Sequence, residues 1–198
     1  MSGEFSPNPN DPRVIRTRQL IQDAFFYHLN QKDFSAITVR DITQRATINR
    51  ATFYAHFADK YELLESVLSF AFEEYVLKQI DVQAHLTEET LKQLVISLCN
   101  YHDSSNQCIK KYESVAPIFE ENIKAQLEKL ILELTTSQTD GAEPPKTLAY
   151  LATMLSWSIY GVTYRWNLEE RQESPVELAE RVVPFMLNGV GILNKIMP

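Results

Sequence analysis

Residues 38–68 read TVRDITQRATINRATFYAHFADKYELLESVL, and this stretch decides the fold. Thr38 and Asn49 are residue types that cap helix N-termini, and each precedes a short segment with helical periodicity. We therefore expect one helix from Thr38 to Arg45 and a second from Asn49 to about Phe57, joined by a tight turn. Two helices with this spacing predict a helix-turn-helix, whose second helix is slim enough to enter the major groove of duplex DNA.

The second helix of this pair carries small and hydrogen-bonding side chains on its expected outer face. Phe53 and Phe57 are expected to turn inward and anchor it. Arginine is the commonest bidentate partner of guanine, so Arg50 is expected to contact either a base or a neighbouring phosphate. The outward residues are Asn49, Arg50, Ala51, Thr52 and Tyr54.

The same stretch is similar to the N-terminal signature of the TetR family of bacterial transcriptional regulators. The resemblance covers about Arg13 to Phe72. It implies an all-α fold, with an N-terminal three-helix helix-turn-helix head and a C-terminal helical ligand-binding and dimerisation domain. It also implies a homodimeric repressor. The matching residues are Thr38, Asp41, Ile42, Thr52, Phe53, Tyr54, His56, Phe57, Asp59, Lys60, Leu63 and Leu64.

The resemblance implies a role for individual side chains at the DNA. Thr38 would cap its helix and meet a phosphate, and Tyr54 and His56 would bond phosphates. Arg50, Ala51 and Thr52 would face base edges, with Arg40 at the groove or its wall and Lys60 at the start of the long helix. Tyr54 and His56 alternatively are ordinary surface residues, and Arg13, Arg16 and Arg18 either approach phosphates or are solvated charges. The expected DNA-binding set is Thr38, Arg40, Asn49, Arg50, Ala51, Thr52, Tyr54, His56 and Lys60.

One departure from the family pattern lies in the turn. Thr47 follows Ala46 where relatives usually carry glycine or another small residue. A β-branched residue resists a positive φ, so we expect a slightly different turn shape here.

Outward from this stretch, the chain reads as helix almost throughout. A first helix is expected to begin at Asp11–Pro12, and a long fourth helix, capped by Asp59, from Tyr61 to Ile80 with Tyr75 on its buried side. The side chains of Phe34 and Ile37, in the connection after the first helix, are expected to pack into the core. Further helices are expected at 88–102, 107–111, 114–134, 146–168 and 175–195, with a loop at 135–145. The expected division is a disordered leader 1–10, a helix-turn-helix domain 11–58, a connecting helix 59–80, and an effector-binding and dimerisation domain 81–198.

The last two expected helices are apolar on most of their surface. The apolar surface of such helices must be buried, and a second copy of the chain is the simplest partner that could bury it. Gly161 and Gly189 would permit close helix approach or sit in an ordinary core, and Pro184 should bend the last helix. The expected dimer interface is Leu148, Leu155, Ile159, Val162, Val182, Met186, Val190 and Leu193.

An effector pocket is the second feature that the resemblance implies for the C-terminal part. Aromatic walls with a few polar tips suit a small molecule, although they also describe an ordinary core, and His102 alternatively lies at a solvent-facing helix end. A metal site from His85, Cys99, His102 and Cys108 is disfavoured because the spacing is irregular. The candidate pocket residues are Tyr101, His102, Tyr112, Phe119, Trp157, Tyr160, Tyr164 and Trp166.

Composition and charge narrow the function classes. The net charge is −7, but residues 1–60 hold eight Lys/Arg against six Asp/Glu, whereas residues 61–198 hold eleven against twenty. A mildly basic N-terminal part suits a polyanion at one end only. No signal peptide, membrane span, Gly-rich phosphate loop or G-x-S-x-G motif is present, so we expect a cytoplasmic non-enzyme without a cofactor. Its expected partners are an operator in double-stranded DNA, a second copy and an unknown small-molecule effector. The alternative is a DNA-binding helical adaptor controlled by a protein partner.

Overall fold

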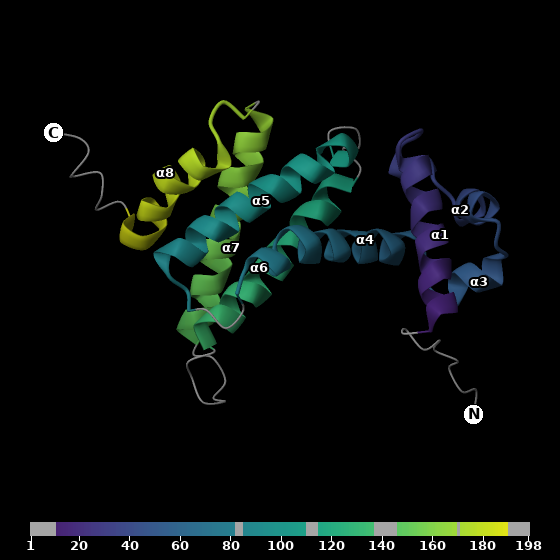
Figure 1. Cartoon of the computed structure of the whole chain (residues 1–198), viewed down its shortest axis with the longest axis horizontal. Coiled ribbons are helices and arrows are strands. Elements are labelled where there is room, and N and C mark those ends of the chain that lie inside the picture. Colours follow the sequence, from purple (N-terminus) through teal and green to yellow (C-terminus); the bar gives the residue numbers. More distant parts are fainter. Residues whose placement is uncertain (1–10, 82–84, 110–114, 137–145, 170, 190–198) are drawn as a thin grey trace. The chain divides into compact units, whose positions relative to one another are not determined.

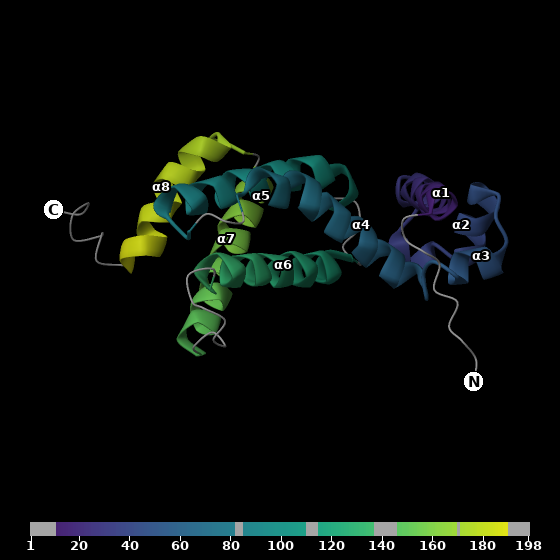
Figure 2. The same ribbon diagram turned by 60° about the horizontal axis from the view of Figure 1, so that its bottom comes forward.

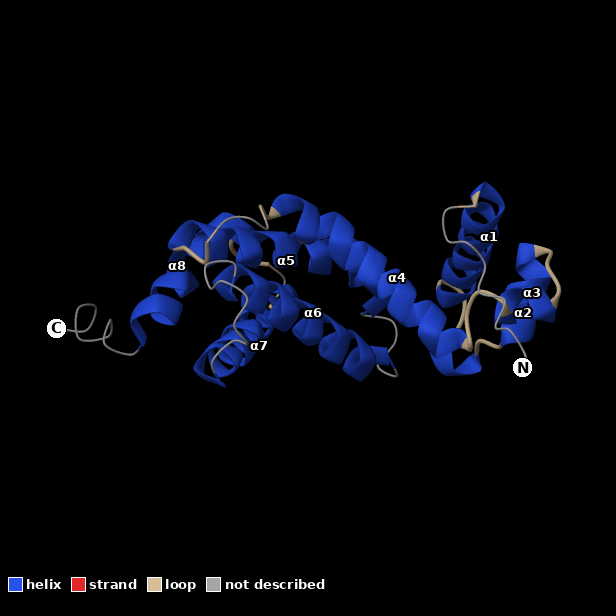
Figure 3. Ribbon diagram, turned by 90° about the horizontal axis from the view of Figure 1, so that it is seen from below, coloured by secondary structure: helices blue, strands red, loops and turns tan. Residues whose placement is uncertain are grey.

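A computed structural model describes residues 11–81, 85–109, 115–136, 146–169 and 171–189. Within these ranges the regular structure is helical, with no strand (Figure 3), and no helix is both long and apolar enough to cross a membrane. The all-α prediction is confirmed. The elements are α1 (Pro12–Leu29), η1 (Phe34–Ala36), α2 (Val39–Ala46), α3 (Arg50–Tyr54), α4 (Lys60–Tyr75), η2 (Leu77–Gln79), α5 (Glu88–Ile109), α6 (Ala116–Thr136), α7 (Lys146–Leu168) and α8 (Pro175–Asn188).

The chain divides into two compact units. The N-terminal unit comprises Met1–Leu68 with Gln107–Ile118, and the C-terminal unit comprises Ser69–Asn106 with Phe119–Pro198. Within the N-terminal unit α1 packs on α2, and α2 packs on α3 (Figure 1).

Helix starts in the N-terminal unit are set by side-chain caps, as predicted. The Asp11 carboxylate accepts from the Arg13 N–H at 2.8 Å, with Pro12 in the first turn. At α4 the Asp59 carboxylate accepts from the N–H groups of Tyr61 and Glu62 at 2.8 and 2.9 Å. Each cap satisfies a backbone donor that the first helical turn leaves without an intrahelical partner.

The core of the N-terminal unit confirms the predicted inward residues. Phe34, Ile37, Phe53 and Phe57 are all buried, and they come from η1, its C-cap, α3 and the segment after α3. Phe34 packs edge-on against Phe25 of α1, with ring centroids 6.1 Å apart. These contacts place the short α3 on the surface of the unit while anchoring its inner side.

Three predicted helices end earlier in the structure than the sequence predicts. The second helix of the helix-turn-helix, α3, ends at Tyr54 and not at about Phe57. The fourth helix stops at Tyr75, and i to i+3 hydrogen bonds follow from Gln79 N to Val76 O and from Ile80 N to Leu77 O. A 3₁₀ turn of this kind is a common helix ending. Tyr75 is exposed, which corrects its predicted burial. At the other end of the chain α8 ends at Asn188, because Gly189 takes a φ of +57° that a right-handed helix does not allow.

The predicted break after His102 is absent. One helix, α5, continues to Ile109, although the sequence Ser-Ser-Asn that follows Asp103 is typical of helix ends. Of the predicted short piece 107–111, positions 110 and 111 lie outside the described residues, as do the leader 1–10 and most of the loop, 137–145.

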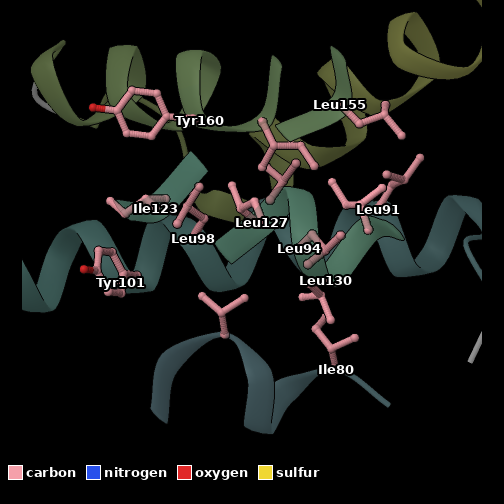
Figure 4. Close-up of a cluster of buried hydrophobic side chains, with 14 of the residues drawn as sticks. Ile80, Leu91, Leu94, Leu98, Tyr101, Ile123, Leu127, Leu130, Leu155 and Tyr160 are labelled. Atoms are coloured by element: carbon pink, nitrogen blue, oxygen red, sulfur yellow. The ribbon is translucent and has the colours of Figure 1, made fainter. Parts of the chain in front are cut away.

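The C-terminal unit is built around one hydrophobic cluster (Figure 4). Its side chains come from the end of α4, from Val76 and Ile80, and from α5, α6, α7 and α8. Figure 2 shows the ribbons of these helices. Leu94, Leu98, Leu127 and Ile159 are fully buried within it. The cluster therefore fixes which face of each long helix points inward.

Candidate nucleic-acid interface and predicted pocket

The N-terminus of α2 is closed by a reciprocal pair of side chains. The Thr38 hydroxyl accepts from the Asp41 N–H at 3.2 Å, and the Asp41 carboxylate accepts from the Thr38 N–H at 2.8 Å. The same carboxylate binds the Lys32 ammonium at 2.7 Å. The bonds from Lys32 and Thr38 hold the pKa of Asp41 well below its usual range. Thr38 is therefore the helix cap that the sequence predicts, and it remains exposed.

The turn between α2 and α3 has the left-handed shape despite its β-branched residue. Thr47 lies at φ 57° and ψ 41°, and its N–H donates to Gln44 O at 3.3 Å. The expected change of turn shape is thus not observed. A non-glycine residue in this region costs on the order of 1–2 kcal/mol, which the surrounding packing must offset.

Because Phe53 and Phe57 anchor one side of the α3 segment in the core, the side chains on its other side are exposed. The Asn49 side-chain oxygen accepts from the Thr52 N–H at 2.7 Å and from the Thr52 hydroxyl at 3.0 Å, which caps the helix. Arg50 and Ala51 are exposed, and Tyr54 is 55% exposed. A rigid small helix with hydrogen-bonding groups on one face has the form that major-groove contact requires.

Tyr54 and His56 follow the exposed face toward α4. The Tyr54 ring stands edge-on to buried Phe53, with centroids 5.5 Å apart, and the side chain is exposed. His56 is half-buried, and its burial together with the nearby Arg18 guanidinium lowers the pKa of the imidazole.

Arg18 of α1 is held beside this segment. Its guanidinium lies 4.6 Å from the centroid of the Phe57 ring and donates to the Ser66 hydroxyl at 3.3 Å. Sequence reasoning grouped Arg18 with Arg13 and Arg16 without separating the three. The signal that distinguishes Arg18, an aromatic neighbour 39 positions later, depends on the tertiary fold.

Lys60 differs from the other predicted DNA-binding residues. Its ammonium donates to the carbonyl oxygens of Phe34, Ser35 and Ile37 at 2.9, 3.1 and 2.8 Å. An ammonium has three protons, so these bonds occupy all of them. Burial is the main cause that lowers the pKa of Lys60. This geometry favours a structural role, tying the connection before α2 to the start of α4, and the DNA contact stays a prediction.

Arg40 is exposed on α2, as a groove contact would require. The neighbouring Arg45 instead stacks its guanidinium 3.6 Å from the centroid of the Tyr27 ring.

Half of the predicted pocket residues form a compact cluster inside the C-terminal unit. The His102 ring lies 6.0 Å from both Tyr101 and Tyr160 and 6.3 Å from Tyr164, centroid to centroid. Tyr160 and Tyr164 stack at 5.6 Å. His102 is 1% exposed, which excludes the solvent-facing alternative.

His102 is neutral in this cluster. The Thr163 hydroxyl donates its single proton to backbone carbonyls of α7, at 2.8 Å from Ile159 O, so it accepts from His102 Nε2 at 3.2 Å. Burial, followed by the positive charge of Arg171, lowers the pKa of His102 to about 4. The imidazole therefore acts as a hydrogen-bond donor within an aromatic setting.

The remaining predicted pocket residues differ from one another in burial. Phe119 and Trp166 are buried, and the Trp166 indole N–H donates to Glu173 O at 2.7 Å. Trp157 is 58% exposed, with the Lys124 ammonium 4.1 Å from its ring centroid. Tyr112 lies outside the described residues.

Of the two cysteines, Cys99 is buried, and burial raises the pKa of its thiol to about 12. Cys108 belongs to the positions whose side chains are not described.

A hollow of about 540 Å³ that the sequence did not predict lies between α7 and α8. Val162, Trp166, Leu178 and Val182 form its apolar part. Two ion pairs edge it: Arg165 with Glu169 at 2.8 Å, and Arg181 with Glu173 at 3.1 Å.

The predicted dimer interface is corrected at two positions. Leu155 and Ile159 are buried in the core of a single chain, 7% and 0% exposed (Figure 4 shows Leu155). Leu148, Val162, Val182 and Met186 are partly exposed, whereas Val190 and Leu193 lie outside the described residues. The exposed apolar stripe of α7 is instead Tyr150, Leu151, Met154, Trp157 and Leu168.

Comparison with protein families gives two matches. Residues 28–67 match the family described as bacterial regulatory proteins, tetR family. Residues 89–188, just over half of the chain, match the family described as transcriptional regulator C-terminal region.

One curated relative matches the chain over part of its length. An 84-residue segment is 39% identical to the HTH-type transcriptional regulator YxbF of Bacillus subtilis. The segment is 42% of this chain and 22% of that protein, so the chain spans well under two thirds of the relative.

Solved structures with similar folds align over most of the chain. The dihydroxyacetone kinase operon activator DhaS has a TM-score of 0.59 at 23% identity, covering 90% of this chain and 98% of its own. A TetR transcriptional regulator from Streptococcus agalactiae also scores 0.59, at 22% identity, over 89% and 96%. The fatty acid degradation regulator FadR from Bacillus halodurans scores 0.53 at 17% identity, over 88% and 96%. At these identities the likeness concerns the fold alone.

Proposed function

The chain belongs to the TetR family of transcriptional regulators, and we propose that it is a repressor that binds a palindromic operator as a homodimer and is released by a small molecule. The observation that carries the DNA-binding part is the exposed face of α3. Arg50, Ala51 and Tyr54 are exposed while Phe53 and Phe57 of the same segment are buried, so a rigid helix presents a fixed set of contacts.

In this proposal base contacts and phosphate contacts come from different residues. Arg50, with Ala51 and Thr52, lies in the major groove and distinguishes base pairs by hydrogen bonds and shape. Thr38, Tyr54 and His56 bond phosphates on either side and fix the position of the helix, without carrying sequence information.

A homodimer is needed because one five-residue helix contacts too few base pairs for specificity in a genome. The exposed apolar side chains of α7 support this part of the proposal, since large apolar side chains gathered on one helix are normally covered by a partner. Two-fold symmetry then predicts half-sites roughly 34–36 Å apart, one turn of DNA.

The effector part of the proposal uses the cluster around His102. A small molecule that enters among Tyr101, His102, Tyr160 and Tyr164 would separate rings that now pack against one another. We propose that bound effector favours a second spacing of the two DNA-binding heads, which lowers operator affinity. A coupling free energy of about 1–3 kcal/mol would give a useful response.

The test is a selection of bound duplexes from a random library with the full chain. The expected result is one palindromic consensus, bound by a species that sediments as a dimer. Met154→Glu, on the exposed stripe, should sediment as a monomer and lose selective binding. An enriched pool without a consensus, or a wild-type chain that is monomeric at micromolar concentration, contradicts the proposal.

A further inference from the structure

Arg18 and His56 of the N-terminal unit both lie close to the ring of Phe57. The Arg18 guanidinium carbon is 4.6 Å from the Phe57 ring centroid, and the His56 ring centroid is 6.5 Å from that centroid. Both side chains are partly exposed, whereas Phe57 is 1% exposed. A guanidinium from α1 and an imidazole from the segment between α3 and α4 thus both lie near this buried ring.

Arg18 is fixed in place before any ligand arrives. The ring of Phe57 supports one face of the guanidinium, and the Ser66 hydroxyl of α4 accepts one of its N–H groups at 3.3 Å. A guanidinium has five N–H donors, so this bond leaves most of them for a phosphate. The entropy cost of ordering the side chain is largely met by the fold, which favours tight binding.

We propose that Arg18 and His56 together hold one phosphodiester of duplex DNA, and that His56 takes up a proton from solvent when it does so. The inference rests on the DNA binding proposed above and adds a residue, Arg18, and a proton to it. The phosphate oxygens accept from the guanidinium and from the imidazolium, which are charge-assisted bonds.

Proton uptake follows from the charges around His56. Burial and then the Arg18 guanidinium of α1 lower the pKa of His56 in the free chain, so both disfavour the imidazolium there. The charged groups nearest in the chain are engaged with the protein: Asp59 caps α4, Glu62 accepts from the Ala58 N–H, and Lys60 donates to three carbonyls. A phosphate brings a negative charge against both Arg18 and His56, which raises the pKa of His56 in the complex.

The sign of the linkage is therefore fixed. The complex binds more protons than the free protein and DNA, so affinity rises as pH falls between the His56 pKa of the complex and that of the free chain. The limiting change is about tenfold in affinity per pH unit for each head.

The experiment measures the affinity of a fluorescent duplex of about 30 base pairs, recovered by selection with the wild-type chain, from pH 5.5 to 8.5 at constant ionic strength. Wild type should bind more tightly at low pH. His56→Gln, which donates a hydrogen bond but does not titrate, should bind with a nearly flat pH profile. The matched control is His28→Gln, a histidine of α1 whose Nε2 lies 3.1 Å from Asp41 O, and it should keep the wild-type slope.

Arg18→Gln separates phosphate binding from a structural role. Removing the opposing charge raises the pKa of free His56, so the pH-dependent window should move to higher pH while affinity falls. Nuclear magnetic resonance of the His56 ring reads both pKa values directly, and the duplex should raise the pKa where inorganic phosphate at equal ionic strength does not.

The possible outcomes are distinct. Equal slopes in wild type and His56→Gln, or a His56 pKa that the duplex leaves unchanged, would overturn the inference while operator binding stands. A shift of equal size with inorganic phosphate overturns the assignment to DNA. A wild-type chain that selects no duplex contradicts the proposed function itself.

Discussion

The two units of this protein place their polar side chains in opposite ways. In the N-terminal unit, polar groups such as Thr38, Asn49 and Asp59 cap helices at the surface, and the buried side chains are mostly apolar, with Thr43 as a buried polar residue. In the C-terminal unit, His102 and Thr163 are buried between α5 and α7, within the cluster that we propose as the effector site. The N-terminal unit can therefore change its outward residues at little cost to stability, whereas the proposed effector contacts in the C-terminal unit are also core contacts.

The largest expected effect tests the faces of α7. Ile159→Ala removes buried atoms from the C-terminal cluster and should lower the free energy of unfolding by about 4 kcal/mol. Met154→Ala, on the exposed stripe, should change the stability of the single chain by less than about 0.5 kcal/mol. Urea unfolding at several protein concentrations separates this effect from dimer dissociation. If both variants lost the same free energy of unfolding at low protein concentration, the assignment of Ile159 to the buried face and Met154 to the exposed face would be wrong.

The next effect tests the buried histidine of the C-terminal unit. The pKa of His102 is about 4 in the fold against an ordinary value of about 6.5, so the unfolded chain binds a proton first as pH falls. The stabilisation is present above pH 6.5 and is lost on acidification toward pH 4, by about 3 kcal/mol in total. The measurement is the free energy of unfolding at pH 7 and pH 5, in wild type and in His102→Gln. Between pH 7 and pH 5 the free energy of unfolding of the wild type should fall by about 2 kcal/mol more than that of the variant. Equal losses would mean that burial does not keep His102 neutral.

In the N-terminal unit, the outward residues should affect DNA binding and leave stability unchanged. Arg50→Ala should cost about 2 kcal/mol of affinity for the selected duplex and relax the preference at one or two base pairs. Repeating the duplex selection with the variant gives the readout. A consensus identical to that of wild type would move Arg50 from the bases to a phosphate.

A smaller effect is expected at a phosphate contact. Tyr54→Phe removes one hydroxyl from an exposed ring and should reduce affinity by about 1 kcal/mol for any duplex sequence. Tyr61→Phe serves as the control, because Tyr61 is also exposed but its ring packs edge-on against Phe34. A loss confined to the selected sequence would assign Tyr54 to the bases.

Local signals predicted most of the N-terminal unit. The caps at Asp11, Thr38, Asn49 and Asp59 act within three residues of their partners, so the sequence contains both members of each interaction. The exception is Arg18, whose partners Phe57 and Ser66 come from later elements. Periodicity places Arg18 on a helix without saying what lies opposite.

The C-terminal unit shows where periodicity fails. The bounds of α7 were predicted correctly, but the helix is apolar on several sides, and its pattern does not say which side meets α5, α6 and α8. Leu155 and Ile159 therefore entered the predicted interface although neighbours in the same chain bury them. The hollow between α7 and α8 was missed for the same reason, since its lining combines two helices and their connection.

The smallest effect compares one backbone conformation in both units. Thr47 and Arg171 both have left-handed φ values, 57° and 58°. Thr47→Gly removes strain of about 1–2 kcal/mol but adds chain entropy of about 0.5–1 kcal/mol, so stability should rise by about 0.5 kcal/mol. Arg171→Gly relieves similar strain but loses the bonds of the guanidinium to Asn167 and Asp103, so stability should fall by about 1 kcal/mol. Thermal unfolding measures both changes. If the two changes in stability have opposite signs, chain connectivity maintains the left-handed conformation in the helix-turn-helix, and side-chain contacts maintain it in the C-terminal unit. If both variants lose stability, the Thr47 side chain makes stabilising contacts of its own.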